Sequence, residues 1–75
     1  MAARHEAHAL VLDVVGTLPD NQQEAFRLKF QDELAYRDIA AVMGVSLGTV
    51  SNWITAALGT VRDRLRADTD LAQEV

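Results

Sequence analysis

The stretch Tyr36-Arg-Asp-Ile-Ala-Ala-Val-Met-Gly-Val-Ser-Leu-Gly-Thr-Val-Ser-Asn-Trp-Ile54 decides the fold. It predicts two helices joined by a tight turn at Gly44-Val45-Ser46, because glycine adopts the left-handed backbone of a sharp helix exit without strain. Ser46 can accept a free N–H of the second helix as its N-cap. This order of residues is typical of a helix-turn-helix, whose second helix can enter the major groove of DNA. An ordinary helical hairpin shares parts of the pattern and is the alternative.

Apolar positions on both sides of the turn predict one shared core. They are Ile39, Ala40 and Met43 in the first helix and Val50, Trp53 and Ile54 in the second. The small Ala40 allows the two helices to cross closely. We expect Trp53 to be half-buried against Val50 and the preceding helix, since an indole buries a large area. The alternative is an exposed aromatic ring at a protein or DNA contact.

Two further helices are predicted before this stretch, at about residues 5–15 and 21–31. Between them, Asp20 with Gln23 resembles a capping box. Phe26 and Phe30 lie one turn apart and are expected to anchor the core. We therefore expect an all-α fold, a compact four-helix domain with a C-terminal helix-turn-helix.

The last helix carries an apolar stripe, which predicts that it continues to about Arg66. The stripe consists of Val50, Ile54, Ala57, Leu58, Val61 and Leu65. Gly59 falls on the opposite, open face. The acidic residues 67–75 are expected to fray. This gives a single domain over residues 1–75, with a leading helix in 1–17, the helix-turn-helix part in 18–66 and an acidic tail in 67–75.

The composition excludes several classes of function. The chain has 75 residues and no cysteine, so it has neither a disulfide frame nor a thiolate metal site. No apolar run approaches the roughly 20 residues of a membrane span, and no signal peptide is evident, which favours the cytoplasm. His5 and His8 have a spacing that suits a metal, but without a third ligand we expect solvated side chains, no metal and no cofactor. The chain has neither a cysteine nucleophile nor a phosphate-binding loop, so we expect no enzyme.

The charge distribution bears on a nucleic-acid partner. The net charge of −4 counts against one. Residues 46–66, however, contain three arginines and one aspartate, a net charge of +2. The arginines Arg62, Arg64 and Arg66 either contact DNA or complement the dipole at the helix C-terminus.

Several short motifs lie along residues 18–66. They are Leu18-Pro19, Glu24-Ala-Phe-Arg-Leu28, Leu34-Ala-Tyr-Arg-Asp-Ile-Ala40, Gly48-Thr-Val50, and Ala57-Leu58 followed by Val61-Arg62 and Leu65. Together they resemble region 4, the C-terminal promoter-recognition domain of bacterial sigma-70 family sigma factors, most closely those of the extracytoplasmic-function group.

This resemblance implies a role in transcription initiation. The domain would dock on the β flap of the RNA polymerase core while its last helix recognises the −35 promoter element, and an anti-sigma factor is a possible further partner. The DNA contacts would come from Gly48, Thr49, Ser51, Asn52, Trp53, Thr55 and Ala56, with Arg37 as a phosphate contact.

The chain departs from the family at three of these positions. Members commonly carry Arg or Lys where this chain has Ser51, Trp53 and Ala56. Loss of about three phosphate contacts would reduce the slope of log K for DNA binding against log salt concentration by roughly three. Two alternatives remain. One is a protein-interaction module on the same fold that has lost DNA reading, whose mark would be a contiguous apolar patch around Trp53, Ala56 and Ala57. The other is a dimeric repressor with two recognition helices.

Overall fold

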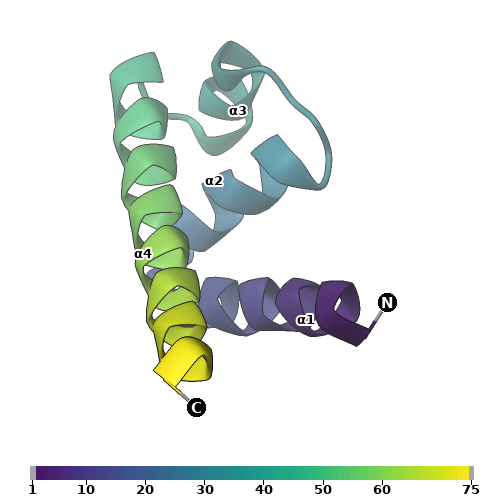
Figure 1. Cartoon of the computed structure of the whole chain (residues 1–75). Helices are drawn as coiled ribbons and strands as arrows, with labels where there is room; N and C mark the ends of the chain where they lie inside the picture. Colours follow the sequence, from purple (N-terminus) through teal and green to yellow (C-terminus); the bar gives the residue numbers. More distant parts are fainter. Residues whose placement is uncertain (1, 75) are drawn as a thin grey trace.

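Residues 2–74 form four helices, and no strand lies within them. The computed structural model describes the backbone of these residues and the side chains of residues 10–67. The helices are α1 (Ala2–Thr17), α2 (Asp20–Phe30), α3 (Tyr36–Met43) and α4 (Leu47–Glu74). The long α4 packs against each of the other three, with α1 at one end and α3 at the other (Figure 1). The predicted all-α class and the four helices are confirmed.

The core consists of two clusters that share α4. The leader cluster contains Val14, Val15, Leu18, Ala57 and Val61. The turn cluster contains Ala25, Ile39, Ala40, Val50 and Ile54. The apolar stripe of α4 therefore contributes to both clusters, because successive turns of one helix face α3 and α2 first and α1 further along.

Two predictions for α2 were wrong. Pro19 is the N-cap and makes no side-chain cap bond, so Asp20 lies inside the first turn and forms no capping box. Phe30 is 48% exposed rather than part of the core, although its ring lies 4.7 Å from that of Phe26. Ala25 is the fully buried residue of this helix. Phe30 lies about 140° around the helix from Ala25, so it points away from the core.

The connection between α2 and α3 has two weak points. Glu33 adopts a left-handed backbone with φ 58°, which is unfavourable for a residue with a side chain. Ala35 is the N-cap of α3 and forms no side-chain cap bond, as its sequence predicts. The ammonium of Lys29 lies 5.2 Å from the centre of the Tyr36 ring, a cation–π contact across this connection.

The long helices extend further than their sequence patterns predicted. The backbone of α4 continues to Glu74, so the predicted end near Arg66 was wrong. Neither glycine nor proline follows Gly59, and acidic side chains by themselves do not end a helix. The backbone of α1 begins at Ala2, whereas the side chains of His5 and His8 lie outside the described residues.

Within the described residues, no single helix is both long and apolar enough to cross a membrane. The pair α3 and residues 47–67 of α4 meets the length and composition test together, but it is bent by 106°. The buried apolar side chains of this pair contribute to the turn cluster and to the leader cluster.

Candidate nucleic-acid interface

The turn before α4 has the geometry that the sequence predicts. Gly44 has φ 68° and ψ 37°, the left-handed conformation that glycine adopts without strain. Its N–H and that of Val45 both donate to the carbonyl of Ala40, the latter at 3.0 Å. These bonds close the C-terminus of α3 and direct the chain into α4.

Ser46 is the N-cap of α4. Its Oγ accepts the Thr49 N–H at 3.1 Å and lies 2.9 Å from the Thr49 hydroxyl oxygen. The prediction for Ser46 is confirmed. The bond also engages the Thr49 hydroxyl in the cap, which leaves it less free to contact a base than its sequence position alone indicates.

The face of α4 that points away from the core forms a continuous surface, which we name the outer stripe. Its residues are Gly48, Asn52, Thr55, Gly59, Arg62 and Arg66, spaced at three or four positions. All are exposed except Gly59, which is partly exposed and has open space where a side chain would begin. The opposite face is buried in both clusters. The start of the outer stripe is therefore accessible to a partner.

The structure separates the predicted DNA-contacting residues into two groups. Arg37, Gly48, Asn52, Thr55 and Ala56 are exposed. Thr49, Ser51 and Trp53 are partly buried. Arg37 belongs to α3 and the others to the first three turns of α4. Contact of these residues with DNA stays a prediction.

Trp53 packs against the turn cluster, which confirms the expected half-buried indole. Ala57, one turn further along α4, is completely buried in the leader cluster. No exposed apolar patch can therefore extend over Trp53, Ala56 and Ala57, the arrangement that a protein-interaction module without DNA reading was expected to show. Packing of the indole stabilises the fold, and only part of its surface is accessible to a partner.

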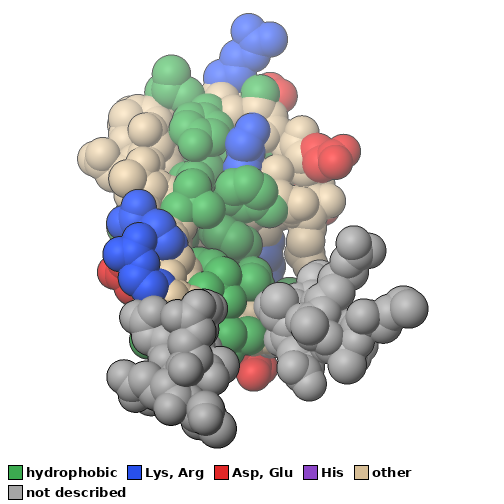
Figure 2. Space-filling model, in the orientation of Figure 1, with side chains coloured by type: hydrophobic (Ala, Val, Ile, Leu, Met, Phe, Trp, Pro, Cys, Tyr) green, Lys and Arg blue, Asp and Glu red, His purple; other side chains and the backbone are tan. Residues whose placement is uncertain are grey.

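A second surface, which sequence reasoning missed, lies between α1 and α2. A hollow of about 240 Å³ is lined by Leu12, Val15, Phe26, Arg27 and Gln31. Leu12 is 50% exposed at its edge, and the half-exposed Phe30 follows on α2. Figure 2 shows apolar side chains in a band along one face of the molecule. The sequence contains the apolar lining residues, but only the placement of α2 beside α1 brings them together in a hollow.

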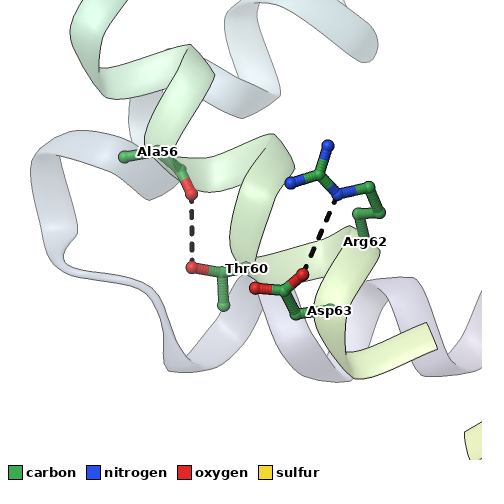
Figure 3. A network of polar contacts seen from close by, with 4 residues as sticks. All are labelled: Ala56, Thr60, Arg62 and Asp63. Carbon is green, nitrogen blue, oxygen red and sulfur yellow. Dashed lines mark hydrogen bonds and ion pairs between the residues drawn. The ribbon is translucent and has the colours of Figure 1, made fainter. Parts of the chain in front are cut away.

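The described charged side chains of α4, which lie at positions 62, 63, 64 and 66, are all exposed. Figure 2 shows basic side chains gathered on the lower part of this helix, where the described arginines are Arg62, Arg64 and Arg66. Arg62 Nε lies 3.8 Å from Asp63 Oδ1, with both side chains 71% exposed (Figure 3). An exposed pair at this distance stabilises little and leaves the guanidinium available. Among the described residues, no group of three His, Asp or Glu side chains is placed to hold a metal.

Comparison of the sequence with known proteins identifies relatives of this chain. A sequence model of the family described as "Sigma-70, region 4" matches residues 8–62. The RNA polymerase sigma-E factor of Streptomyces coelicolor is 31% identical over 64 residues, and that of Streptomyces avermitilis is 28% identical over 64 residues. Each alignment covers 85% of this chain but only 36% of the relative.

Proposed function

The chain belongs to the sigma-70 region 4 family, and on that premise we propose that it recognises the −35 promoter element while bound to the RNA polymerase core. The observation that supports this most is the exposed start of α4, held in place by the Gly44 turn and the Ser46 cap. A helix presented in this way can enter a major groove with its first turns on the base edges.

Base reading is assigned to the first half of the outer stripe. Asn52 is exposed and can make two hydrogen bonds with an adenine edge. Thr55 can donate to or accept from a base or a phosphate, and Gly48 allows a close backbone approach. The N-terminus of α4 favours a phosphate through its free N–H groups and dipole. Ser51, Thr49, Trp53 and Ala56 flank these contacts, and Arg37 reaches a phosphate from α3.

Core binding is assigned to the hollow between α1 and α2. Its apolar residues Leu12, Val15 and Phe26 suit an apolar segment of the polymerase, for which the β flap is the expected candidate. An anti-sigma factor would compete for the same kind of surface. Tethering to the polymerase raises the local concentration of promoter DNA, so weak intrinsic affinity suffices. The domain then works in the cytoplasm by binding and catalyses no reaction of its own.

The test is selection of duplex DNA from a randomised −35 library, with and without RNA polymerase core. The wild-type chain is expected to enrich one sequence, at least in the presence of core. Asn52→Ala should lose about 1–3 kcal/mol of discrimination at one base pair. Asn21→Ala, the same change at an exposed position of α2, is the matched control and should leave the preference unchanged. Absence of enrichment in both conditions contradicts the proposal.

A protein-interaction module is the second candidate, supported by the apolar hollow and by the neutral residues at 51, 53 and 56. It predicts that core or an anti-sigma protein is retained on the immobilised chain while no promoter fragment is enriched. Leu12→Asp would then abolish all binding by the chain. On the leading proposal, the same substitution weakens the retention of core but leaves the binding of promoter DNA by the isolated chain unchanged.

A further inference from the structure

Interaction with the helix dipole does not explain the positions of the arginines in α4. Arg62 and Arg66 lie twelve and eight residues before the end of the helix at Glu74. The effect of the dipole falls off within the last turn, so neither side chain is close enough to benefit. The extension of α4 beyond Arg66 thus removes one of the two roles that the sequence left open for them.

Arg62 lines a shallow hollow in the middle of the outer stripe, which we name the notch. The notch has a volume of about 410 Å³ and is lined by Thr55, Leu58, Gly59 and Arg62. Thr55, Gly59 and Arg62 follow each other at four and three positions, so they stack along one face of the helix. A Cβ on Gly59 would meet nothing within 4 Å, which leaves the floor of the notch open to a ligand.

The donors around the notch fit an anion. Thr55 offers a hydroxyl and Arg62 a guanidinium with several N–H groups in a planar fork, which matches a phosphate. The carboxylate of Asp63 approaches only Nε of Arg62, at 3.8 Å (Figure 3). The half-exposed Leu58 adds an apolar edge that can pack against a deoxyribose. Segment 46–66, with its net charge of +2, complements the charge of a nucleic-acid backbone.

We propose that the notch binds a backbone phosphate of promoter DNA and that Arg62 supplies the charge absent at Ser51, Trp53 and Ala56. This inference rests on the proposed function, since it assumes that Asn52 lies against a base edge. Gly59 is seven residues beyond Asn52, or about 10 Å along the helix axis. The major groove is about 12 Å wide. A helix that reads a base with Asn52 therefore brings the notch to the phosphates at the border of the groove.

The first experiment measures the salt dependence of binding to the selected duplex by fluorescence anisotropy, with core present where wild-type binding requires it. Arg62→Ala should lower the slope of log K against log salt by about 0.9, the contribution of one phosphate. Arg64→Ala is the matched control, because Arg64 has the same charge and is also exposed but lies about 200° around the helix from Arg62. It should leave the slope unchanged.

The second experiment removes the ligand instead of the arginine. Single methylphosphonate substitutions in the duplex each remove one phosphate charge. The wild-type chain should lose several-fold in affinity at one phosphate near the groove border, and Arg62→Ala should be insensitive to that substitution. Gly59→Leu, which fills the notch without changing charge, should weaken binding several-fold, whereas Gly59→Ala should bind almost as the wild type does.

The outcomes distinguish this inference from the proposed function. Equal slopes for Arg62→Ala and Arg64→Ala, or no methylphosphonate effect that depends on Arg62, overturn the notch and leave base reading by Asn52 intact. Loss of core binding by Arg62→Ala without any change in DNA binding assigns the notch to an acidic protein group and likewise overturns it. Absence of DNA binding by the wild-type chain, with and without core, removes both proposals.

Discussion

Two segments of α4 differ sharply in charge although they belong to one continuous helix. Residues 47–61, the neutral segment, contain no charged side chain, whereas residues 62–66, the arginine segment, contain three arginines and one aspartate. The buried face of the helix runs through the neutral segment into both core clusters, while the outer stripe continues into the arginine segment. A rigid helix thus holds the charge at a fixed distance from the residues that are proposed to read bases.

This difference teaches that base reading and phosphate binding can be separated along a helix. Phosphate contacts orient a protein on DNA and base contacts specify the sequence. In this chain the neutral segment has side chains suited to base contacts, and the arginine segment offers Arg62 for a phosphate contact. Substitutions in and around the two segments test the comparison, in order of decreasing expected effect.

The largest effect is expected where the neutral segment is anchored. Ile54 has no exposed surface in the turn cluster, so Ile54→Ala should lower the free energy of unfolding by about 2–5 kcal/mol. Val61→Ala, in the leader cluster, removes less apolar surface and should cost about 1–3 kcal/mol. Thermal unfolding followed by circular dichroism measures both. A smaller loss at Ile54 than at Val61 would show that the two clusters hold α4 in the reverse order of strength.

Adding positive charge to the neutral segment should remove the difference between the two segments. Ser51→Arg combined with Ala56→Arg adds two cations among the proposed DNA contacts. Each charge-assisted contact contributes on the order of 1 kcal/mol or more, so affinity for promoter DNA should rise at least about ten-fold. The salt slope should steepen by about 1.8. Asn21→Arg, on α2, is the control for a change in overall charge and should have little effect on either quantity.

Removing the N-cap of α4 should change the free energy of unfolding more than adding the missing N-cap of α3. Ser46→Ala removes the bond to the Thr49 N–H and should lower the free energy of unfolding by about 1 kcal/mol. Ala35→Ser places a hydroxyl at the uncapped start of α3 and should raise it by about 0.5 kcal/mol or more. Denaturant titration of the two variants checks the signs. A neutral result for Ser46→Ala would mean that water replaces the cap without loss.

The smallest effect is expected at the border between the two segments. Gly59 lies in the helix interior with free space above it, so Gly59→Ala should raise the free energy of unfolding by about 0.5–1 kcal/mol. The corresponding rise in the midpoint of thermal unfolding is about 2–8 °C for a domain of this size. Destabilisation would contradict the open surface described for Gly59. Gly48→Ala, near the start of the same helix, serves as the comparison.

Local rules explain what could be predicted from the sequence. The bounds of α3, the left-handed Gly44 and the Ser46 cap all depend on residues within a few positions of one another. The outer stripe also follows from helical periodicity once the apolar stripe of α4 is recognised. The exposure of Asn52 was therefore predictable, although its contact with DNA stays a prediction.

Predictions failed where the environment of a residue depends on the placement of other parts of the chain. Phe30 is as apolar as Phe26, but only Phe26 packs against a core cluster, because α1 and α4 lie on its side of α2. Asp20 has the right neighbours for a capping box, but the helix already begins at Asp20 and Pro19 takes the cap position. The hollow between α1 and α2 required the relative placement of two helices.

The sequence by itself determined the helix-turn-helix, since a glycine, a serine cap and a 3.6-residue apolar period act through the backbone of their own neighbours. Only the tertiary structure decided that α4 runs past both core clusters and continues to Glu74, which leaves Arg62 and Arg66 far from the helix end. Burial depends on which helices meet, and that is set by the packing of the whole chain.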